Sequence, residues 1–317
     1  MHQVEEMAYV GRRPWHRLGN QLERHQPIEV WRQKAGMDWK IEESEVHYMS
    51  WPTDTQGLIH SFSDQKVLYR SDTQAPLAVV SKRFQVVQPG EILEFYRDLT
   101  ALHGFELETA GVLRGGRKFW ALARTGQSTV LPGKDRVDGY LLLASACDGT
   151  LATTAQFTSV RVVCNNTLQI ALNKGEGVVK VPHRSTFNPE WVKGKLGLSV
   201  AAWGGFVDRM KVLCECPVDP DTVDGLLRRV LTYGGANPNL VNEQAVAGTR
   251  ALYEGAGHGA LLASSRGTAW GLLNSLTEYV DHHRRARSED HRRDAAWFGQ
   301  GAAIKQRAWD EVMRLIA

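Results

Sequence analysis

The stretch that decides the fold is Phe105-Glu106-Leu107-Glu108-Thr109-Ala110-Gly111-Val112-Leu113-Arg114-Gly115-Gly116-Arg117-Lys118-Phe119-Trp120-Ala121-Leu122-Ala123-Arg124. Two strand-like runs, Phe105 to Leu113 and Arg117 to Arg124, flank Arg114-Gly115-Gly116, where glycine allows the positive φ of a tight turn. A second pair of runs, 139–146 and 151–163, flanks Asp148-Gly149, a strong turn signal. The sequence therefore predicts two successive β-hairpins.

Working outward, further strands are predicted at 39–49, 66–69, 77–80 and 84–87. Pro89 can begin a helix that runs through Leu102 and ends at Gly104. The side chains of Asn165, Asn166 and Thr167 offer an N-cap to a helix through Leu172. After residue 188 the apolar spacing becomes helical only, with helices expected at 191–214, 223–231, 243–253, 268–280 and 304–316.

These patterns predict an α+β fold, in which an antiparallel β-sheet of hairpins packs with helices and a helical C-terminal domain follows. The expected organisation is an N-terminal arm over 1–38, because Pro14 disfavours a helix at Arg13. The sheet domain follows over 39–187 as the candidate single-strand binding core, and the helical domain spans 188–317.

Composition limits the class of protein. With 317 residues and 43% hydrophobic residues, the chain can bury a large core. It lacks the roughly 18 consecutive apolar residues of a membrane span and a secretory leader, so we expect a cytoplasmic protein. Four cysteines in such a length indicate reduced thiols without a structural disulfide. The net charge of +3 permits nucleic-acid binding without requiring it.

Several of these stretches resemble the phage/plasmid-like protein family, whose core is catalogued as a domain of unknown function (932). The resemblance is carried by Pro14 to Gly19, Thr109 to Gly111 with Gly115 to Arg117, Asp148-Gly149, Arg161 to Leu168, and Asn274 with Thr277 to His282. It implies a protein of a mobile element but no assigned chemistry. The order of elements is also remotely similar to Rad52-type single-strand annealing proteins, by analogy alone.

The first hairpin is the leading binding candidate. Lys118, Trp120 and Arg124 alternate onto one strand face, which would supply cations for phosphates and a ring for base stacking. Arg114 and Arg117 bracket the turn and could reach a phosphate backbone. The alternative is that Trp120 packs under a helix and that the cations are a solvated rim.

Two further groups are candidates for phosphate contacts. Arg161 precedes Asn165 and Asn166 at an expected helix start, where free N–H groups favour an anion, although these residues could equally form a buried network. Arg284 and Arg285 belong to a basic cluster with His282, His283 and His291, which could also be a solvated helix end. Glu278 and Asp281 are interpreted as partners of these arginines.

No catalytic residue, metal site or cofactor is predicted. Cys164 near a helix start could be a nucleophile with His183, but a buried thiol is favoured. Cys214 and Cys216 lack a second pair for zinc. Nucleotide-binding glycine loops and the His-Glu-x-x-His motif are absent from the sequence.

The functional hypothesis is an ATP-independent protein of a phage or plasmid that binds and anneals single-stranded DNA in recombination or replication. Its partners would be single-stranded DNA and further copies of itself in a ring or filament, without a membrane. One alternative is an enzyme acting on nucleic acids or nucleotides through Asn165, Asn166, Asp148 and Glu278. Another is a non-enzymatic partner of host defence or replication proteins, marked by an exposed apolar patch.

Overall fold

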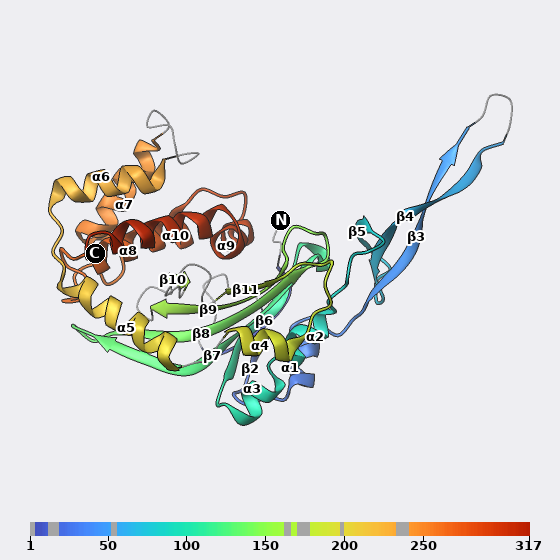
Figure 1. Cartoon of the computed structure of the whole chain (residues 1–317), viewed down its shortest axis with the longest axis horizontal. Helices are drawn as coiled ribbons and strands as arrows, with labels where there is room; N and C mark the ends of the chain where they lie inside the picture. Colours follow the sequence, from blue (N-terminus) through green and yellow to red (C-terminus); the bar gives the residue numbers. More distant parts are fainter. Residues whose placement is uncertain are drawn as a thin grey trace.

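The structure, a computed structural model, describes residues 4–11, 19–51, 56–161, 166–169, 178–196, 200–232 and 241–317. Its centre is an eight-stranded sheet (Figure 1). The strand order is β10-β9-β8-β7-β6-β1-β2, and β11 also pairs with β9. The strands are β1 (Val4–Val10), β2 (Asn20–Leu22), β6 (Glu106–Leu113), β7 (Lys118–Leu131), β8 (Asp135–Ala146), β9 (Thr153–Arg161), β10 (Asn166–Gln169) and β11 (Val178–Val181).

All pairs of the main sheet are antiparallel except β1 with β2. Both predicted hairpins are present. A single 3-10 turn, Arg114–Gly116, joins β6 to β7, and its Gly115 has a φ of 67°. Gly149, in the turn between β8 and β9, has a φ of 75°. Glycine is favoured at both positions because other side chains rarely adopt a positive φ.

A second sheet forms an arm. It contains β3 (Ile41–Ser50), β4 (Leu58–Arg70) and β5 (Pro76–Ser81) in the order β3-β4-β5. The hairpin of β3 and β4 extends far from the main sheet, and its end has no helix beside it (Figure 1). We call β3 and β4 the arm.

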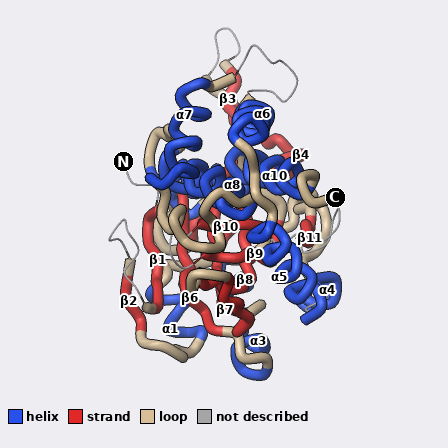
Figure 2. The backbone as a smooth tube through the Cα atoms, turned by 90° about the vertical axis from the view of Figure 1, so that its left-hand side faces the viewer, coloured by secondary structure: helices blue, strands red, loops and turns tan. Residues whose placement is uncertain are grey.

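Helices lie on both sides of the main sheet. The N-terminal ones are α1 (Ile28–Lys34), α2 (Pro89–Glu94) and α3 (Arg97–Leu102). The others are α4 (Pro189–Leu196), α5 (Val200–Glu215), α6 (Pro220–Leu231), α7 (Glu243–Ala251), α8 (Ala269–Glu278), α9 (Glu289–Phe298) and α10 (Gln300–Met313). Figure 2 shows α6, α7, α8 and α10 above the strands and α1 and α3 below them.

Alternation along β7 explains this layering. Phe119, Ala121 and Ala123 join the large core that includes α1 to α3, whereas Trp120 and Leu122 join a second cluster contacted by the end of α9. Successive residues of a strand point to opposite faces of the sheet. A strand that is apolar at every position must therefore be covered on both faces. We call these surfaces the α1–α3 face and the α9 face.

The fold class is confirmed: the chain is an α+β protein with antiparallel sheets and C-terminal helices. The strands expected at 39–49, 66–69 and 77–80 lie in β3, β4 and β5, and each helix expected after 188 has a counterpart. The predicted boundary falls immediately before Pro189, the first residue of α4.

Four expectations require correction. Within the predicted arm over 1–38, β1 and β2 belong to the main sheet and α1 to its cover. Residues 84–87 form no strand, and the helix after Pro89 is interrupted between Glu94 and Arg97. Residues 166–169 form β10 instead of a helix, because their backbone pairs with Arg161 to Thr158 of β9. Residues 162–165 and 170–177 lie outside the described part. No helix in the described segments is long and apolar enough to span a bilayer.

Candidate nucleic-acid interface

The predicted stacking platform on β7 is buried. Lys118, Trp120 and Arg124 do share one face, but α9 covers much of it. Trp120 is 1% exposed and packs edge-on against Trp297, with 6.2 Å between ring centroids. Lys118 is 4% exposed. The expectation that Lys118 and Trp120 contact a DNA strand is therefore wrong for this structure, because an apolar ring gains more from packing under a helix than from water.

A shared carboxylate holds α9 on this face. Asp294 accepts hydrogen bonds from the Arg114 guanidinium at 2.6 Å and from the Lys118 ammonium. The Lys118 nitrogen also lies 5.3 Å from the centroid of the Phe298 ring. Arg114 is thus engaged inside the protein and is not a free phosphate ligand. The carboxylate of Asp294 and these two cations compensate one another's charge, and removing one of them would leave a nearly buried charge without its partner.

Arg124 lies beside a small polar pocket at the other end of β7. It donates to Glu108, which also accepts a hydrogen bond from the Tyr140 hydroxyl at 2.9 Å. Burial, together with the Glu108 charge, raises the pKa of Tyr140. The cavity, about 170 Å³, is also lined by Glu106, Arg136 and Asp138. Because each arginine here has an acidic neighbour, the pocket offers no net positive site for a phosphate.

Arg117 is exposed and lies where several loops meet. Its carbonyl accepts a hydrogen bond from the Cys147 amide at 2.9 Å, which joins the first turn to the turn between β8 and β9. The far end of that second turn, the Leu151 carbonyl, is 2.8 Å from Nε2 of His183. The His183 carbonyl in turn accepts from the Gln85 amide at 2.5 Å. One end of the sheet thus gathers loops from four parts of the chain.

A pair of stacked rings occupies this end. Phe84 and His183 lie 4.3 Å apart between centroids, with an angle of 18° between planes, and both are partly exposed. Each ring has an exposed arginine as its sequence neighbour: Arg83 precedes Phe84, and Arg184 follows His183. Lys180, near the end of β11, is exposed as well. We call the cations Arg83, Arg117, Lys180 and Arg184, with the two rings, the loop cluster.

The cations of the loop cluster are not compensated within the described part of the chain. Arg83, Arg117, Lys180 and Arg184 form no ion pair with a described residue, whereas the exposed arginines Arg97, Arg136 and Arg229 do. Exposed cations without acidic partners keep their full charge available for an anion. The loop cluster therefore combines exposed cations without acidic partners and a pair of partly exposed rings.

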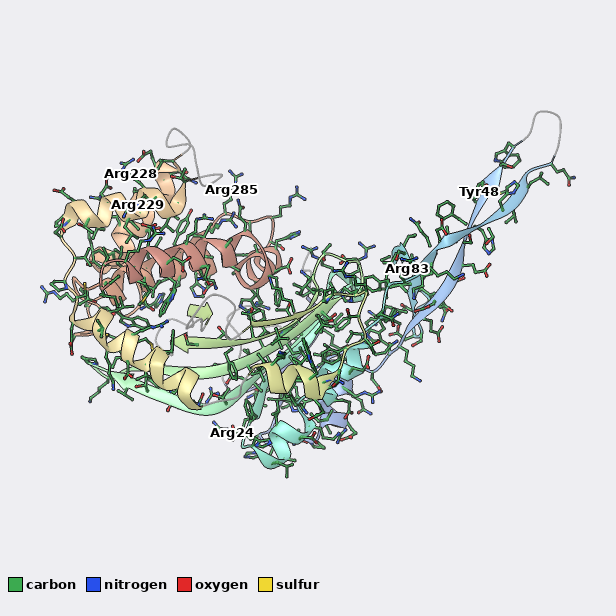
Figure 3. All side chains as sticks on the ribbon, viewed as in Figure 1. Arg24, Tyr48, Arg83, Arg228, Arg229 and Arg285 are labelled. Atoms are coloured by element: carbon green, nitrogen blue, oxygen red, sulfur yellow. The ribbon has the colours of Figure 1, made fainter. Side chains whose placement is uncertain are left out.

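Other sequence candidates are dispersed. The backbone of Arg161 ends β9 and pairs with Asn166, but no side chain of Arg161 or Asn166 is described, and Asn165 lies outside the described residues. Arg284 donates to Gln300, and its carbonyl accepts from Arg292 at 2.8 Å. Arg285 is exposed and forms no ion pair with a described residue. Figure 3 places Arg83 at the base of the arm, Arg285 beside the C-terminal helices, and Arg24 on the opposite side of the main sheet from Arg285.

The acidic residues near the basic cluster have different partners from those expected. Glu278, 2% exposed, accepts from the backbone and ring of His258, the latter at 2.8 Å. Asp281 pairs with Lys305 at 2.8 Å. The hydrogen bonds found for these two carboxylates are thus to His258 and to Lys305, neither of which is an arginine of the basic cluster. Asp148 instead bonds Thr150 in the turn between β8 and β9, so no described interaction joins it to Glu278.

Arg83, Lys180, Arg184, Phe84 and His183 were not predicted as one site. A signal exists in the sequence, because Lys82-Arg83-Phe84 and His183-Arg184 each place a ring beside a cation. They lie about a hundred residues apart, however, and local patterns cannot reveal that their loops pair.

The cysteines and acidic groups show no reactive or metal-binding geometry. In the ranges that the structure covers, no three His, Cys, Asp or Glu residues are placed to hold a metal ion. Cys147, Cys214 and Cys216 form no disulfide within the described residues. Burial raises the pKa of the Cys147 thiol to about 12, with a smaller contribution from the Asp148 charge. Cys164 lies outside the described residues.

Comparison with known proteins identifies a family but no function. No curated protein and no solved structure matches the chain. The family described as "Domain of unknown function (DUF932)" matches residues 76–297, which include the loop cluster, the main hairpins and α4 to α9. This segment is more than half of the chain, so the protein belongs to the DUF932 family.

Proposed function

We propose that the protein binds single-stranded DNA through the loop cluster and anneals complementary strands without ATP, as a recombination or replication accessory of a phage or plasmid. The observation that carries the proposal is the stacked, partly exposed pair Phe84 and His183, each ring being next in sequence to an exposed arginine, Arg83 or Arg184, that has no ion pair with a described residue. Phosphates need cations, and bases stack on exposed rings with a gain of about 1–3 kcal/mol each.

The geometry favours a single strand over a duplex. Arg83, Arg117 and Arg184 belong to three separate loops that backbone contacts and His183 link at one end of the sheet, and cations on separate loops can follow a flexible backbone while bases reach the ring pair. Strand annealing further requires two strands to be held together, and the proposal therefore includes an oligomer, as a ring or filament.

The test is titration of the purified full chain with labelled single-stranded and duplex DNA at two salt concentrations, without nucleotide. We expect tighter binding to the single strand, and replacing both Arg83 and Arg184 by Ala should weaken it. Each lost phosphate contact should also flatten the slope of log K against log salt by about 0.7.

The matched control replaces Arg24 and Arg266 by Ala, because both are exposed arginines outside the loop cluster. Their substitution should leave the slope unchanged. No binding at low salt, or equal effects of the two double variants, would contradict the assignment. The rate at which complementary strands pair in the presence of the protein then tests annealing separately from binding.

A further inference from the structure

Two histidines share one buried carboxylate at the end of α8. Oε1 of Glu278 lies 2.8 Å from Nδ1 of His258 and 3.8 Å from Nε2 of His283. The side chain of Glu278 is 3% exposed, whereas the side chains of His258 and His283 are 70% and 48% exposed. We call these three residues the imidazole site. Its two rings are neighbours that a ligand in solution can reach.

The backbone around the imidazole site brings its side chains together. A π-helical turn, η3 (Leu252–Ala256), precedes His258, and a second one, η4 (Tyr279–His283), follows Glu278. The His258 amide donates to both oxygens of Glu278 at 3.1 Å. Gly257 allows this approach, because a Cβ there would lie 3.1 Å from Oε2 of Glu278 and 2.7 Å from the Leu252 carbonyl oxygen. Such π-helical turns are rare and frequently lie at functional sites.

The carboxylate fixes how each imidazole is presented. An ionised carboxylate can only accept hydrogen bonds, so Nδ1 of His258 carries the proton and Nε2 holds a lone pair. Within the described part of the chain, His258 Nε2 and His283 Nδ1 have no hydrogen-bonding partner. Each ring thus turns one nitrogen to Glu278 and keeps the other available. An imidazole that a carboxylate orients in this way can act as a general acid or base.

The nucleophile for such chemistry has to come from outside the imidazole site. The described contacts of the two rings include no serine, threonine, cysteine or lysine side chain. A Ser–His or Cys–His pair would need one of these groups within hydrogen-bonding distance of a free ring nitrogen. The attacking group must therefore be a water molecule or a group of the substrate itself.

Cations beside the imidazole site favour a substrate that contains phosphate. Arg285 and Arg287 follow His283 closely in the sequence, are exposed and form no ion pair with a described residue. Figure 3 shows Arg285 beside the C-terminal helices, away from the main sheet. Guanidinium groups bind phosphate oxygens through short, charge-assisted hydrogen bonds. We therefore expect a phosphodiester at this surface.

RNA supplies both the phosphodiester and the nucleophile. Its 2′-hydroxyl lies beside the phosphate that it can attack, and a well-oriented intramolecular group can reach an effective concentration of about 10⁵–10⁸ M. DNA lacks this hydroxyl, so water would have to attack without that advantage. Two imidazoles and no nucleophile of the protein are thus suited to RNA and not to DNA.

We propose that the imidazole site cleaves RNA by transphosphorylation. Nε2 of His258 takes the proton of the 2′-hydroxyl, and the 2′-oxygen forms a bond to phosphorus. The bond from phosphorus to the 5′-oxygen of the next nucleotide breaks, and protonated His283 gives the proton of Nδ1 to that oxygen. The products are a 2′,3′-cyclic phosphate and a 5′-hydroxyl. Glu278 is a positioning residue, because it holds Nδ1 of His258 and forms an ion pair with protonated His283.

This activity goes beyond the proposed DNA binding and does not depend on it, because the loop cluster and the imidazole site share no residue. The test incubates the purified full chain, in EDTA, with three labelled oligonucleotides of one sequence: RNA, DNA, and DNA that contains a single ribonucleotide. We expect cleavage of the RNA, cleavage of the third strand only after its ribonucleotide, and intact DNA. Mass spectrometry should identify the cyclic phosphate on the product.

Replacing either His258 or His283 by Ala should lower the cleavage rate by about 10²–10⁴-fold, the usual contribution of a general acid or base. The matched control is His47→Ala, which should cleave like the wild type. His47 is also an exposed imidazole, and its ring lies 3.9 Å from the carboxylate of Glu45, but that carboxylate is itself exposed. Glu278→Gln should lower kcat and leave KM unchanged, because Glu278 orients the rings and does not bind RNA.

Thermal unfolding separates loss of chemistry from loss of the fold. The midpoints of His258→Ala and His283→Ala should equal that of the wild type, because both side chains are largely exposed. RNA that the wild-type chain leaves intact would overturn the proposal, and so would cleavage that EDTA abolishes or products that carry a 5′-phosphate. Equal rates for His47→Ala and His258→Ala would also overturn it, since the activity would then belong to a contaminating nuclease.

Discussion

At the scale of single residues, Asp294 decides which residues of the first hairpin can reach a ligand. Its carboxylate binds Arg114 and Lys118, and the α9 helix that carries it places Trp297 against Trp120. Arg117, on the same turn, forms no such pair and remains exposed. Cations that look alike in the sequence therefore differ in role. Arg114 and Lys118 pair with a carboxylate inside the protein, whereas Arg117 contributes charge to the surface.

Replacing Asp294 by Asn should destabilise the protein by about 3 kcal/mol, because breaking a nearly buried pair leaves Lys118 charged without a partner. Urea unfolding of the variant measures the change. Asp310→Asn on the exposed side of α10 is the control and should cost less than about 0.5 kcal/mol. The additional substitution Lys118→Met should recover part of the loss; if it does not, charge compensation is not the cause.

Cys147 should resist alkylation in the folded protein. Its pKa is raised to about 12 by burial, so at pH 8.5 almost none of it is thiolate. Cys216 is partly exposed and should react first with iodoacetamide, as peptide mass spectrometry would show site by site.

Because the pKa of Cys147 is higher in the folded state, the folded state holds the thiol proton of Cys147 more tightly. Its contribution to stability must therefore fall as pH rises above about 9. Rapid labelling of native Cys147 would disprove this account.

At the scale of elements, alternation was a reliable guide to strands but not to what covers them. The pattern in β7 correctly separates Trp120 from Phe119, yet it cannot show which face meets solvent, because α9 arrives from a distant part of the chain. Similarly, Asn166 and Thr167 are good cap residues, but pairing with β9 makes them a strand. Tertiary pairing outweighs local propensity when it satisfies several backbone groups at once.

The end of the arm, residues 46–51 and 56–62, is the arm tip and should be dispensable for folding. Replacing residues 47–61 by an Asn-Gly turn between the paired Val46 and Phe62 should change the free energy of unfolding by less than about 1 kcal/mol, since β5 pairs with β4 only from Gln65 onward. Urea unfolding provides the measurement. As the comparison, removing the turn between β8 and β9, whose Leu151 carbonyl contacts His183, should be clearly destabilising. Equal losses would mean that the tip has contacts within the chain.

At the scale of the whole molecule, the helical region and the sheet share an interface. Buried Asp135, at the start of β8, accepts hydrogen bonds from Ser264 at 2.7 Å and from the Trp270 indole at 3.1 Å. The α9 face depends on Trp297 and Phe298 for its cover. These contacts connect the sheet with segments more than a hundred residues later.

A fragment of residues 1–187 should therefore aggregate or bind the dye ANS, because it exposes the α9 face and leaves Asp135 without Ser264 and Trp270. Soluble yield and dye fluorescence, compared with the full chain, measure this. Supplying residues 188–317 in trans should reduce the exposed surface. A fragment that is monomeric, unfolds cooperatively and does not bind ANS would show that the sheet is an independent domain.

The sequence by itself determined the α+β class, the two hairpins and the helices after residue 188, because periodicity and glycine turns act within a few residues. It also marked Arg117 and Arg285 as cations that the structure leaves exposed. Only the tertiary structure decided that Lys118 and Trp120 are internal and that Phe84 and His183, the sequence neighbours of Arg83 and Arg184, stack on one another. Those outcomes depend on contacts between distant segments, and burial against a distant partner leaves no periodic trace in the local sequence.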